Sequence, residues 1–469
     1  DVYKRQGKWI LAHLEIPHVD YWNMFGVGKP WRAYSWSSEV VLALVDRLWG
    51  VPGLLILKMA LAILLSFSLF YCLGRLARDW FFGGLLGMYA TASCFNHYTL
   101  RPQSLIWIFL IWLIYTADLT ARAGLNKKRA LSFFAIMLVW ANTHLTMALG
   151  ICVTVGWIWQ RGRTASATRA ALIGILGTLC TPYFGGEWFT FFSKSGHPLS
   201  YSAISEFQPA TILQYSTAFL VVLAVLCGVF LHHRPQALPF VRLMVGWGVV
   251  LTALAVVKFI PWAVIYLCAC TAGIWSDAEG QRRSLGGVAQ GVEKLRKFFM
   301  WLPEAGLAFV FLCAAFVSMS RLWRDPLDRR HIPVAAVDFI IDKQLPHPIL
   351  NEFGKGGYLM YRFSDAKGEL EHRVPLDGRT NVNEPLVYEK FIKAFRGKED
   401  WREYIDLVKP GTILWNTGSA FSALLVADGQ WCEVFRSGPK DDAHVVLVRR
   451  EYCCLLYTSD AADDLLCVD

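Results

Sequence analysis

Charged residues are scarce in this sequence. Only 18% of its 469 residues are charged, whereas soluble domains usually carry about 25%. Hydrophobic residues make up 55% of the chain, and the mean hydropathy is +0.37. The apolar residues concentrate between residues 51 and 322, while the sequence after residue 324 has an ordinary soluble composition. The shortage of charge excludes a single soluble globule and predicts a membrane region followed by a soluble domain.

Cysteine spacings typical of a zinc site or a disulfide framework are also absent. Most of the 12 cysteines lie inside apolar runs, where cysteine behaves as a small hydrophobe. Cys432 stands alone in the soluble region, and the last three cysteines follow it near the C-terminal end. We therefore predict no disulfide framework and no zinc site.

A net charge of +9 does not indicate nucleic-acid binding here. Most basic residues occupy short loops between apolar runs, which is the pattern that orients membrane helices. We predict that nucleic acid is not a partner.

Both ends of the sequence resemble translated sequencing-adapter read-through. These segments are residues 1–6 and 453–469, and we leave them out of the fold prediction. We also expect that native sequence before Gly7 is missing. The alternative is that both segments are genuine disordered ends.

Apolar runs predict the membrane helices. A helix that crosses the hydrocarbon core needs roughly 20 apolar residues. The candidate spans are 51–73, 80–95, 104–117, 130–140, 145–159, 170–183, 212–231, 240–257, 260–275 and 298–319. The runs on either side of residues 141–144 predict two half-length or tilted helices that meet at a polar break.

The loop charges predict the orientation. Alternate loops hold the basic residues Arg75, Arg78, Lys127, Lys128, Arg129, Arg161, Arg163, Arg169, Arg234, Arg282, Arg283, Lys294, Arg296 and Lys297. The positive-inside rule assigns these loops to the cytoplasm. The basic segment 277–297 is predicted to be a solvated connector. Residues 7–39, the corner 96–103, the break at 142–144, the loop 182–209 and everything after residue 321 then face outward.

The region after residue 321 is predicted to be an α/β domain. Helices are expected from residue 333 and over 389–408, and strands over 348–351, 373–377, 411–415 and 443–449. The fold class is thus a polytopic α-helical membrane protein with about nine or ten transmembrane helices and a C-terminal extracytoplasmic α/β domain. The predicted boundaries are a first outer loop at 7–50, a membrane domain at 51–320 and the outer domain at 321–452.

An ordered set of short motifs resembles the GT-C superfamily of membrane glycosyltransferases, and specifically poorly characterised bacterial relatives. The motifs are Gly7-Lys-Trp-Ile-Leu, Ile16-Pro-His-Val-Asp20, Gly28-Lys-Pro-Trp31, Ser35-Trp-Ser-Ser-Glu39, Leu100-Arg-Pro-Gln103, Trp140-Ala-Asn-Thr-His144, Ile204-Ser-Glu-Phe-Gln-Pro209, Leu350-Asn-Glu-Phe-Gly and Leu376-Asp-Gly-Arg-Thr380. The set covers nearly the whole native part of the chain.

The resemblance implies transfer of a sugar from a polyprenyl-phosphate donor to an envelope glycan, lipid or protein, at the outer face of a bacterial plasma membrane. Membrane lipids are further partners, no cofactor is assigned, a divalent metal is left open, and so is the oligomeric state. The family's first catalytic carboxylate would precede Gly7, so it cannot be assigned here. We therefore expect no sugar transfer by the chain as it stands. The alternatives are a non-catalytic or transport protein that binds a lipid-linked glycan and, third, a ligand sensor.

Asp20 and Glu39 are the candidate catalytic carboxylates, because both fall in the predicted first outer loop. A carboxylate there would deprotonate the acceptor hydroxyl. The alternative for Asp20 is a turn or cap. The alternative for Glu39 is a carboxylate that favours a helix N-terminus.

Arg101 is the main candidate for binding phosphate, since guanidinium groups suit bidentate phosphate contacts. Its alternative role is an interfacial anchor. Asn142 and His144 lie between apolar half-helices, where polar groups are costly and often functional. Their alternative role is hydrogen bonding between helices.

Further substrate-binding candidates face the same side of the membrane. These are His97, Gln103, Glu187, Glu206 and Lys258. Asp377 and Arg379 are interpreted most simply as a turn of the outer domain, with a site role as the alternative.

Overall fold

The computed structural model describes residues 2–160, 162–194, 205–211, 214–234, 237–277, 286–298, 332–379, 382–438 and 444–453. The chain divides into two compact units. The helical unit comprises residues 34–38 and 48–323, and the α/β unit comprises residues 1–33, 39–47 and 324–469.

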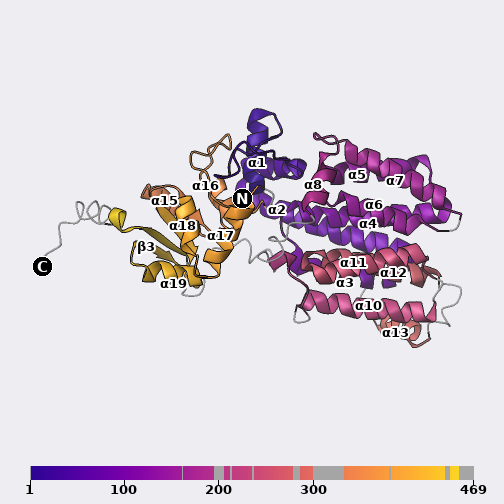
Figure 1. Ribbon diagram of the computed structural model, residues 1–469. Coiled ribbons are helices and arrows are strands. Elements are labelled where there is room, and N and C mark those ends of the chain that lie inside the picture. The colour runs from indigo at the N-terminus through magenta and orange to yellow at the C-terminus, as the bar shows by residue number, and fades with distance from the viewer. Residues whose placement is uncertain are drawn as a thin grey trace. The chain divides into compact units, whose positions relative to one another are not determined.

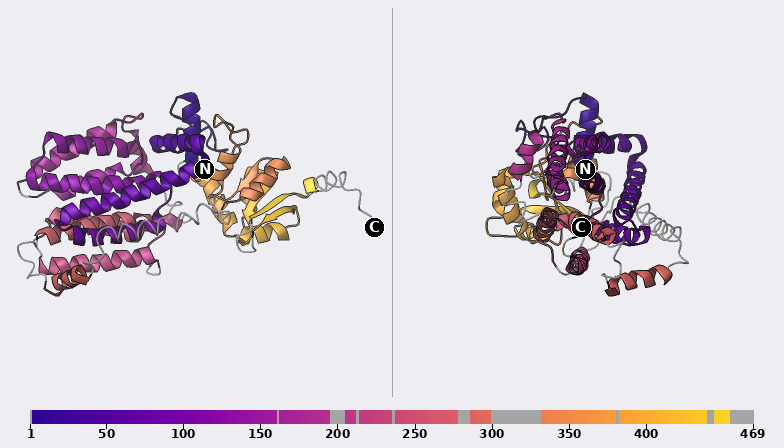
Figure 2. Two further views of the ribbon diagram at one scale, coloured as in Figure 1. Left: turned by 180° about the vertical axis from the view of Figure 1, so that it is seen from behind. Right: turned by 90° about the vertical axis from the view of Figure 1, so that its right-hand side faces the viewer.

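The helical unit consists mainly of apolar helices (Figures 1 and 2). Its helices are α2 (Trp36–Ala77), α3 (Trp80–Cys94), η1 (Phe95–His97), α4 (Pro102–Ala123), α5 (Lys127–Ala141), α6 (Met147–Ile158), α7 (Thr164–Leu179), α8 (Gly186–Lys194), η2 (Ser205–Phe207), α10 (Tyr215–His233), α11 (Phe240–Ala255), η3 (Val257–Phe259), α12 (Ile260–Asp277) and α13 (Gly286–Phe298).

Among the described residues, four helical segments are long and apolar enough to cross a membrane: Trp36–Ala77, Pro102–Ala123, Tyr215–His233 and Val257–Ser276. The other predicted spans between 80 and 257 also fall on helices, but these are shorter, such as α6 with 12 residues and α7 with 16. The predicted span 298–319 lies almost wholly outside the described residues. A mostly helical chain with a small sheet is thus confirmed, while the count of nine or ten spans stays a prediction.

Helix α12 lies at the centre of the helical unit, where it packs against α3, α4, α10 and α11. Its aromatic contacts include Trp262 against Trp140, with ring centroids 5.5 Å apart. In contrast, α2 and α10 expose apolar side chains such as Phe67 and Val222. A buried centre with apolar outer helices is the arrangement expected for a helical bundle in lipid.

Helix α2 is interrupted at Gly50, which has φ 59° and ψ −151°. Only glycine adopts this backbone conformation without strain. Pro52 follows, and proline is tolerated in the first turn of a helix, where its missing N–H would have no partner. Helix α2 therefore consists of two helical segments. Residues 39–47, before the break, belong to the α/β unit, and the segment after the break belongs to the helical unit.

The α/β unit contains a four-stranded sheet of order β1-β2-β4-β3. Its strands are β1 (Ile349–Asn351), β2 (Thr412–Asn416), β3 (Trp431–Ser437) and β4 (His444–Arg449). β1 pairs with β2 in parallel, and β4 pairs antiparallel with both β2 and β3. Its helices are α1 (Val2–His13), α15 (Val334–Asp342), α16 (Gly356–Arg362), α17 (Pro385–Phe395), α18 (Arg402–Val408) and α19 (Ala420–Ala427).

The N-terminal segment folds together with the C-terminal domain, which the predicted boundaries did not anticipate. In α1, Gly7 lies so close to α2 that a Cβ there would be 2.0 Å from the Glu39 carbonyl oxygen. The Tyr361 hydroxyl of α16 donates a hydrogen bond to Asp46 Oδ2 over 2.9 Å. Lys4 Nζ lies 3.6 Å from the same carboxylate. Residues 2–6 therefore belong to α1 and pack in this unit, although the sequence suggested leaving them out.

Two predicted elements of the α/β unit are wrong in detail. Residues 373–377 form no strand, and only Val374 makes an isolated bridge, to Asn23. The predicted helix over 389–408 is broken into α17 and α18, with Gly397 at φ 63° between them. The first error has a physical cause, because the run bridges to Asn23 of the N-terminal segment and does not pair with a strand of the sheet.

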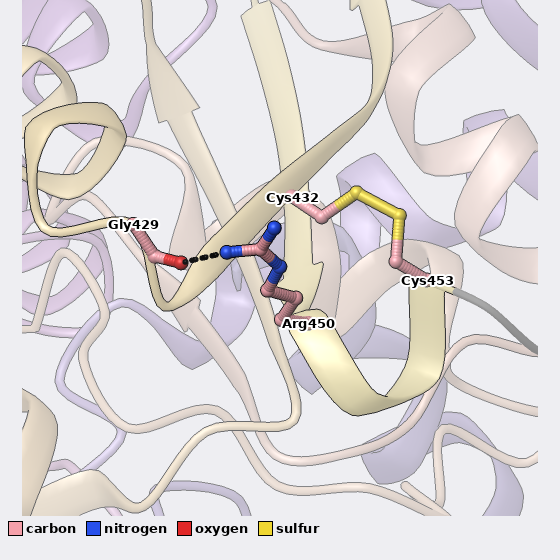
Figure 3. Close-up of a disulfide and its surroundings, with 4 residues drawn as sticks. All are labelled: Gly429, Cys432, Arg450 and Cys453. Atoms are coloured by element: carbon pink, nitrogen blue, oxygen red, sulfur yellow. Dashed lines mark hydrogen bonds between the residues drawn. A yellow bond between two sulfur atoms is a disulfide. The ribbon is translucent and has the colours of Figure 1, made fainter.

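A disulfide joins Cys432 of β3 to Cys453, which follows β4, with Cα atoms 6.2 Å apart (Figure 3). Beside it, Arg450 Nη1 donates to the Gly429 carbonyl oxygen over 3.4 Å. The sequence predicts that Cys432 stands alone, because Cys453 falls in the segment that resembles adapter read-through. The pairing corrects that prediction.

Candidate functional site

Four predicted site residues gather at the end of the helical unit where α4 begins. This corner cluster consists of His97, Arg101, Glu206 and Lys258. Arg101 Nη1 donates a hydrogen bond to Glu206 Oε1. Both side chains remain partly exposed, at 43% for Arg101 and 40% for Glu206. The ion pair brings together two residues that the sequence singled out separately.

Arg101 occupies the N-cap position of α4, where its extended backbone precedes Pro102. Its side chain makes no capping hydrogen bond to the first turn. The first turn of a helix carries unpaired N–H groups and a partial positive charge. Arg101 and this helix end therefore both favour an anion at the same place.

His97 and Lys258 complete the corner cluster. Burial lowers the pKa of His97, although the Glu206 carboxylate acts in the opposite direction. The imidazole is therefore neutral at neutral pH. Its Nε2 is buried and has no hydrogen-bond partner among the described residues. Lys258 Nζ lies 3.4 Å from the centroid of the Phe207 ring, next to Glu206 in the chain.

Asn142 is committed to hydrogen bonds between helices. Its Oδ1 accepts from Trp36 Nε1 over 2.8 Å, and its Nδ2 donates to the carbonyl oxygens of Leu138 and Cys180. Its own carbonyl oxygen accepts from Ser37 Oγ over 2.6 Å. These bonds tie the end of α5 to the start of α2 and to the end of α7. The geometry favours the structural alternative for Asn142.

His144 lies in the short break between α5 and α6. Its Nδ1 is 3.0 Å from Thr146 Oγ1, and its ring meets the Tyr34 ring edge-on with centroids 6.4 Å apart. Among the described contacts none joins Arg101 to Asn142 or His144. Because residues 96–103 and 142–144 are both predicted to face outward, a cavity shared by Arg101, Asn142 and His144 stays a prediction.

Asp20 lies in a different place, within a buried ion-pair cluster of the α/β unit. Arg379 Nη1 donates to Asp20 Oδ1 over 2.6 Å. The same guanidinium contacts both carboxylate oxygens of Asp377, over 2.8 Å and 2.9 Å. The Asn23 amide side chain reaches Asp377 Oδ2 and Asn383 Oδ1. The side chains of Asp20, Asp377 and Arg379 are each no more than 6% exposed.

Electrostatics holds this buried ion-pair cluster in its charged form. Burial alone would raise the pKa of Asp377, but the charge and hydrogen bonds of Arg379 hold it below its usual value. The two carboxylates likewise raise the pKa of Arg379 against the effect of burial. Arg5 lies over the Trp22 ring at 3.6 Å, and burial and then the charge of Arg379 lower its pKa.

The geometry favours a structural role for Asp20, because both of its carboxylate oxygens are occupied. Oδ1 accepts from Arg379, and Oδ2 accepts the Asn23 backbone N–H over 2.9 Å. Glu39 is also buried, in the first turn of α2, as its helix-terminus alternative describes. Asp377 and Arg379, interpreted from sequence as a turn, prove to be the centre of this cluster. The sequence did not indicate that Arg379 pairs with Asp20, because 359 positions separate the two residues.

The remaining candidates contribute less. Glu187 is buried and accepts a hydrogen bond from Thr181 Oγ1 over 2.8 Å. Gln103 lies in the first turn of α4 beside Arg101. Within the described part of the chain, no group of three or more His, Cys, Asp or Glu side chains is arranged to hold a metal.

Comparison with known proteins identifies no family. No family model matches the chain, and no curated protein matches it. The two-unit fold and the corner cluster thus define a mostly helical protein with membrane-length helices.

Proposed function

We propose that this protein is a GT-C-like glycosyltransferase of a bacterial plasma membrane. It moves a sugar from a polyprenyl-phosphate donor to an envelope glycan, lipid or protein on the outer face. The observation that carries the proposal is the Arg101–Glu206 pair at the uncapped start of α4, a helix long enough to span a membrane. It combines an anion-binding group with a carboxylate at a predicted membrane boundary.

In the proposed reaction the donor phosphate takes the place of Glu206 on Arg101. Release from Arg101 frees the carboxylate to accept a proton from the acceptor hydroxyl. The hydroxyl oxygen then bonds to the anomeric carbon of the sugar, and the bond from that carbon to the phosphate oxygen breaks. Polyprenyl phosphate leaves with the electron pair, held by Arg101 through charge-assisted hydrogen bonds.

The other members of the corner cluster suit the same chemistry. Lys258 offers a second cation, and neutral His97 offers a hydrogen-bonding group that does not add charge. Partly exposed side chains at a helix end can be reached by a lipid-linked ligand from the membrane interface.

One observation favours the alternative, a non-catalytic protein that binds a lipid-linked glycan. Asp20 and Glu39, the carboxylates first considered as the base, are both buried. The catalytic proposal then depends on Glu206. Binding and transfer therefore need separate measurements.

The test uses the purified full chain in nanodiscs. Undecaprenyl phosphate is the binding probe, and undecaprenyl-phosphate hexoses with membrane extract test transfer. We expect Arg101→Lys to weaken undecaprenyl phosphate binding about tenfold, because lysine cannot make bidentate phosphate contacts. The matched control is Arg169→Lys, an exposed arginine on α7. Glu206→Gln should retain binding and abolish any transfer.

Each outcome separates the alternatives. Undecaprenyl phosphate binding that is unchanged by Arg101→Lys would remove the proposed donor site. Arg101-dependent binding without transfer would favour the non-catalytic protein. Transfer that survives Glu206→Gln would place the base elsewhere.

The outward placement of the α/β unit rests on the loop charges, and the Cys432–Cys453 disulfide supports it because disulfides persist in oxidising compartments. A cysteine introduced by Ser437→Cys should react with a membrane-impermeant maleimide on intact cells. One introduced by Thr164→Cys, at the start of α7, should react only after the cells are opened. The reverse pattern would overturn the orientation and the outward-facing site with it.

A further inference from the structure

A hollow of about 420 Å³ lies in the helical unit where α2 ends and α3 begins, beside the last turns of α4. Its lining combines cations with aromatic rings: Gly74, Arg75, Arg78, Trp80, Tyr115, Asp118, Leu119 and Arg122. A Cβ at Gly74 would lie 2.4 Å from the Trp80 ring. The missing side chain lets the Trp80 indole pack against α2 and form one wall.

The hollow has an excess of positive charge. The Asp118 carboxylate is already occupied, since Oδ2 accepts from Arg122 Nε over 2.6 Å and Oδ1 accepts from Trp157 Nε1 over 3.3 Å. Arg75 lines the hollow together with Tyr115 and has no carboxylate partner among the described residues. Arg78 contacts neither a carboxylate nor another polar side chain in the described part of the chain.

Asp79 does not neutralise these arginines. It caps α3 by accepting the Phe81 and Phe82 backbone N–H groups. Its other oxygen accepts from Trp275 Nε1 and from Arg296 of α13. Two guanidinium groups therefore face the hollow without a compensating carboxylate, and such an arrangement suits the oxygens of a phosphate group.

An apolar path leads along α2 to these cations. Ile63 and Phe67 are 53% and 58% exposed, and Phe67 stacks on Tyr71 with ring centroids 6.2 Å apart. Residues 63, 67, 71 and 75 follow one another at helical spacing, so they lie along one face over about 18 Å. Exposed apolar side chains that end in uncompensated cations match the shape of a lipid with a charged headgroup.

We propose that this hollow binds the phosphate headgroup of an anionic lipid. Arg75 and Arg78 contact the phosphate oxygens, Trp80 and Tyr115 flank the headgroup, and an acyl chain lies along the face of α2 that carries Phe67. The site is distinct from the corner cluster, because Arg101 and Arg122 lie at opposite ends of α4. That helix has 22 residues, which corresponds to a length of about 33 Å.

The experiment is native mass spectrometry of the full chain purified in detergent with dioleoylphosphatidylglycerol or dioleoylphosphatidylcholine. We expect phosphatidylglycerol to be retained in preference to phosphatidylcholine. The double variant Arg75→Gln/Arg78→Gln should weaken its retention about thirtyfold, which corresponds to about 2 kcal/mol for two interfacial arginines. Arg169→Gln, which removes an exposed arginine outside the hollow, should change nothing.

Two results would overturn the proposal. One is retention of phosphatidylglycerol by the double variant at the level of the unmodified chain. The other is protection against thermal unfolding by 10 mM inorganic phosphate equal to that by phosphatidylglycerol, which would assign the site to a soluble phosphate. If the double variant does not fold, Arg78→Gln alone keeps the test, because Arg78 makes no side-chain contact that the described structure depends on. The Arg101→Lys variant tests the corner cluster alone. Its loss of undecaprenyl phosphate binding would not change the retention of phosphatidylglycerol.

Discussion

Arg101 donates a hydrogen bond to a carboxylate oxygen of Glu206, which follows it by 105 residues in the chain. The pair brings the start of α4 next to η2. Because both side chains are partly exposed, solvent screens their attraction.

Glu206→Gln should therefore alter function without altering stability. Exposed ion pairs contribute about 0–1 kcal/mol, so the thermal midpoint in detergent should stay within a few degrees of the unmodified value. The midpoint can be measured by tryptophan fluorescence. A large drop would show that the pair holds the fold together, and the assignment of Glu206 as a base would lose its support.

Arg379→Met should strongly destabilise the α/β unit. Removing the guanidinium leaves the Asp20 and Asp377 carboxylates buried without their partner, and breaking a buried pair costs about 3–5 kcal/mol. Pulse proteolysis in urea measures the change. Arg436→Met is the matched control, because Arg436 pairs with Glu433 while 47% exposed. Equal effects of the two variants would contradict the role given to the buried ion-pair cluster.

Arg5→Met should be neutral or stabilising, although Arg5 is as buried as Arg379. Its Nε and Nη2 have no hydrogen-bond partner among the described residues, and its Nη1 reaches the Gly368 carbonyl oxygen over 3.4 Å. Methionine keeps the contact with Trp22 and removes donors that cost about 1–3 kcal/mol when buried unpaired. Pulse proteolysis in urea again measures the stability. A loss of stability comparable to that of Arg379→Met would refute the expectation.

The α/β unit should lose stability as pH falls from about 6.5 to about 4. Burial, and then the neighbouring His372, lower the pKa of His347 to about 4. The unfolded chain therefore binds a proton that the folded unit resists, so protonation favours unfolding throughout this interval. This loss of stability can be measured as a change in the hydrogen exchange of the β2 amides with pH. His347→Gln should flatten the dependence, and His372→Gln should flatten it only partly.

Reduction of the Cys432–Cys453 disulfide should destabilise the C-terminal strands. The bond closes a loop with a sequence separation of 21, for which loop-closure entropy predicts about 3 kcal/mol. Alkylation followed by mass measurement should show that the Cys432 and Cys453 thiols react only after reductant is added. If both thiols react without reductant, the bond is absent, and its support for an oxidising compartment goes with it.

Local sequence patterns predicted the local structure well. Apolar runs located helices such as α4 and α11, and strand-like runs bounded by turn residues located β1, β2 and β4. These features depend on residues close together in the chain. The helix boundaries moved by a few residues because capping and tertiary contacts set them.

Long-range pairing could not be predicted in the same way. Asp20 looked like a base in a loop because its partner Arg379 belongs to a distant segment. Residues 373–377 looked like a strand because their extended backbone does not reveal that they face Asn23. The Arg101–Glu206 pair left no mark in the spacing of either residue. Whether a polar residue has a structural role or can bind a ligand depends on side chains that are distant in the sequence.

The separation of Asp20 and Arg379 in the sequence also determines how long after Asp20 its partner is synthesised. Ribosomes add about 5–20 residues per second, so the 359 residues between the two take roughly 20–70 s to synthesise. Throughout that interval the N-terminal segment of a newly made chain lacks the partner that neutralises its buried carboxylate. The helices of the other unit can form meanwhile, because each satisfies its own backbone hydrogen bonds. The N-terminal segment is thus among the last parts of the chain to reach its final contacts, and a chaperone would encounter it unpaired.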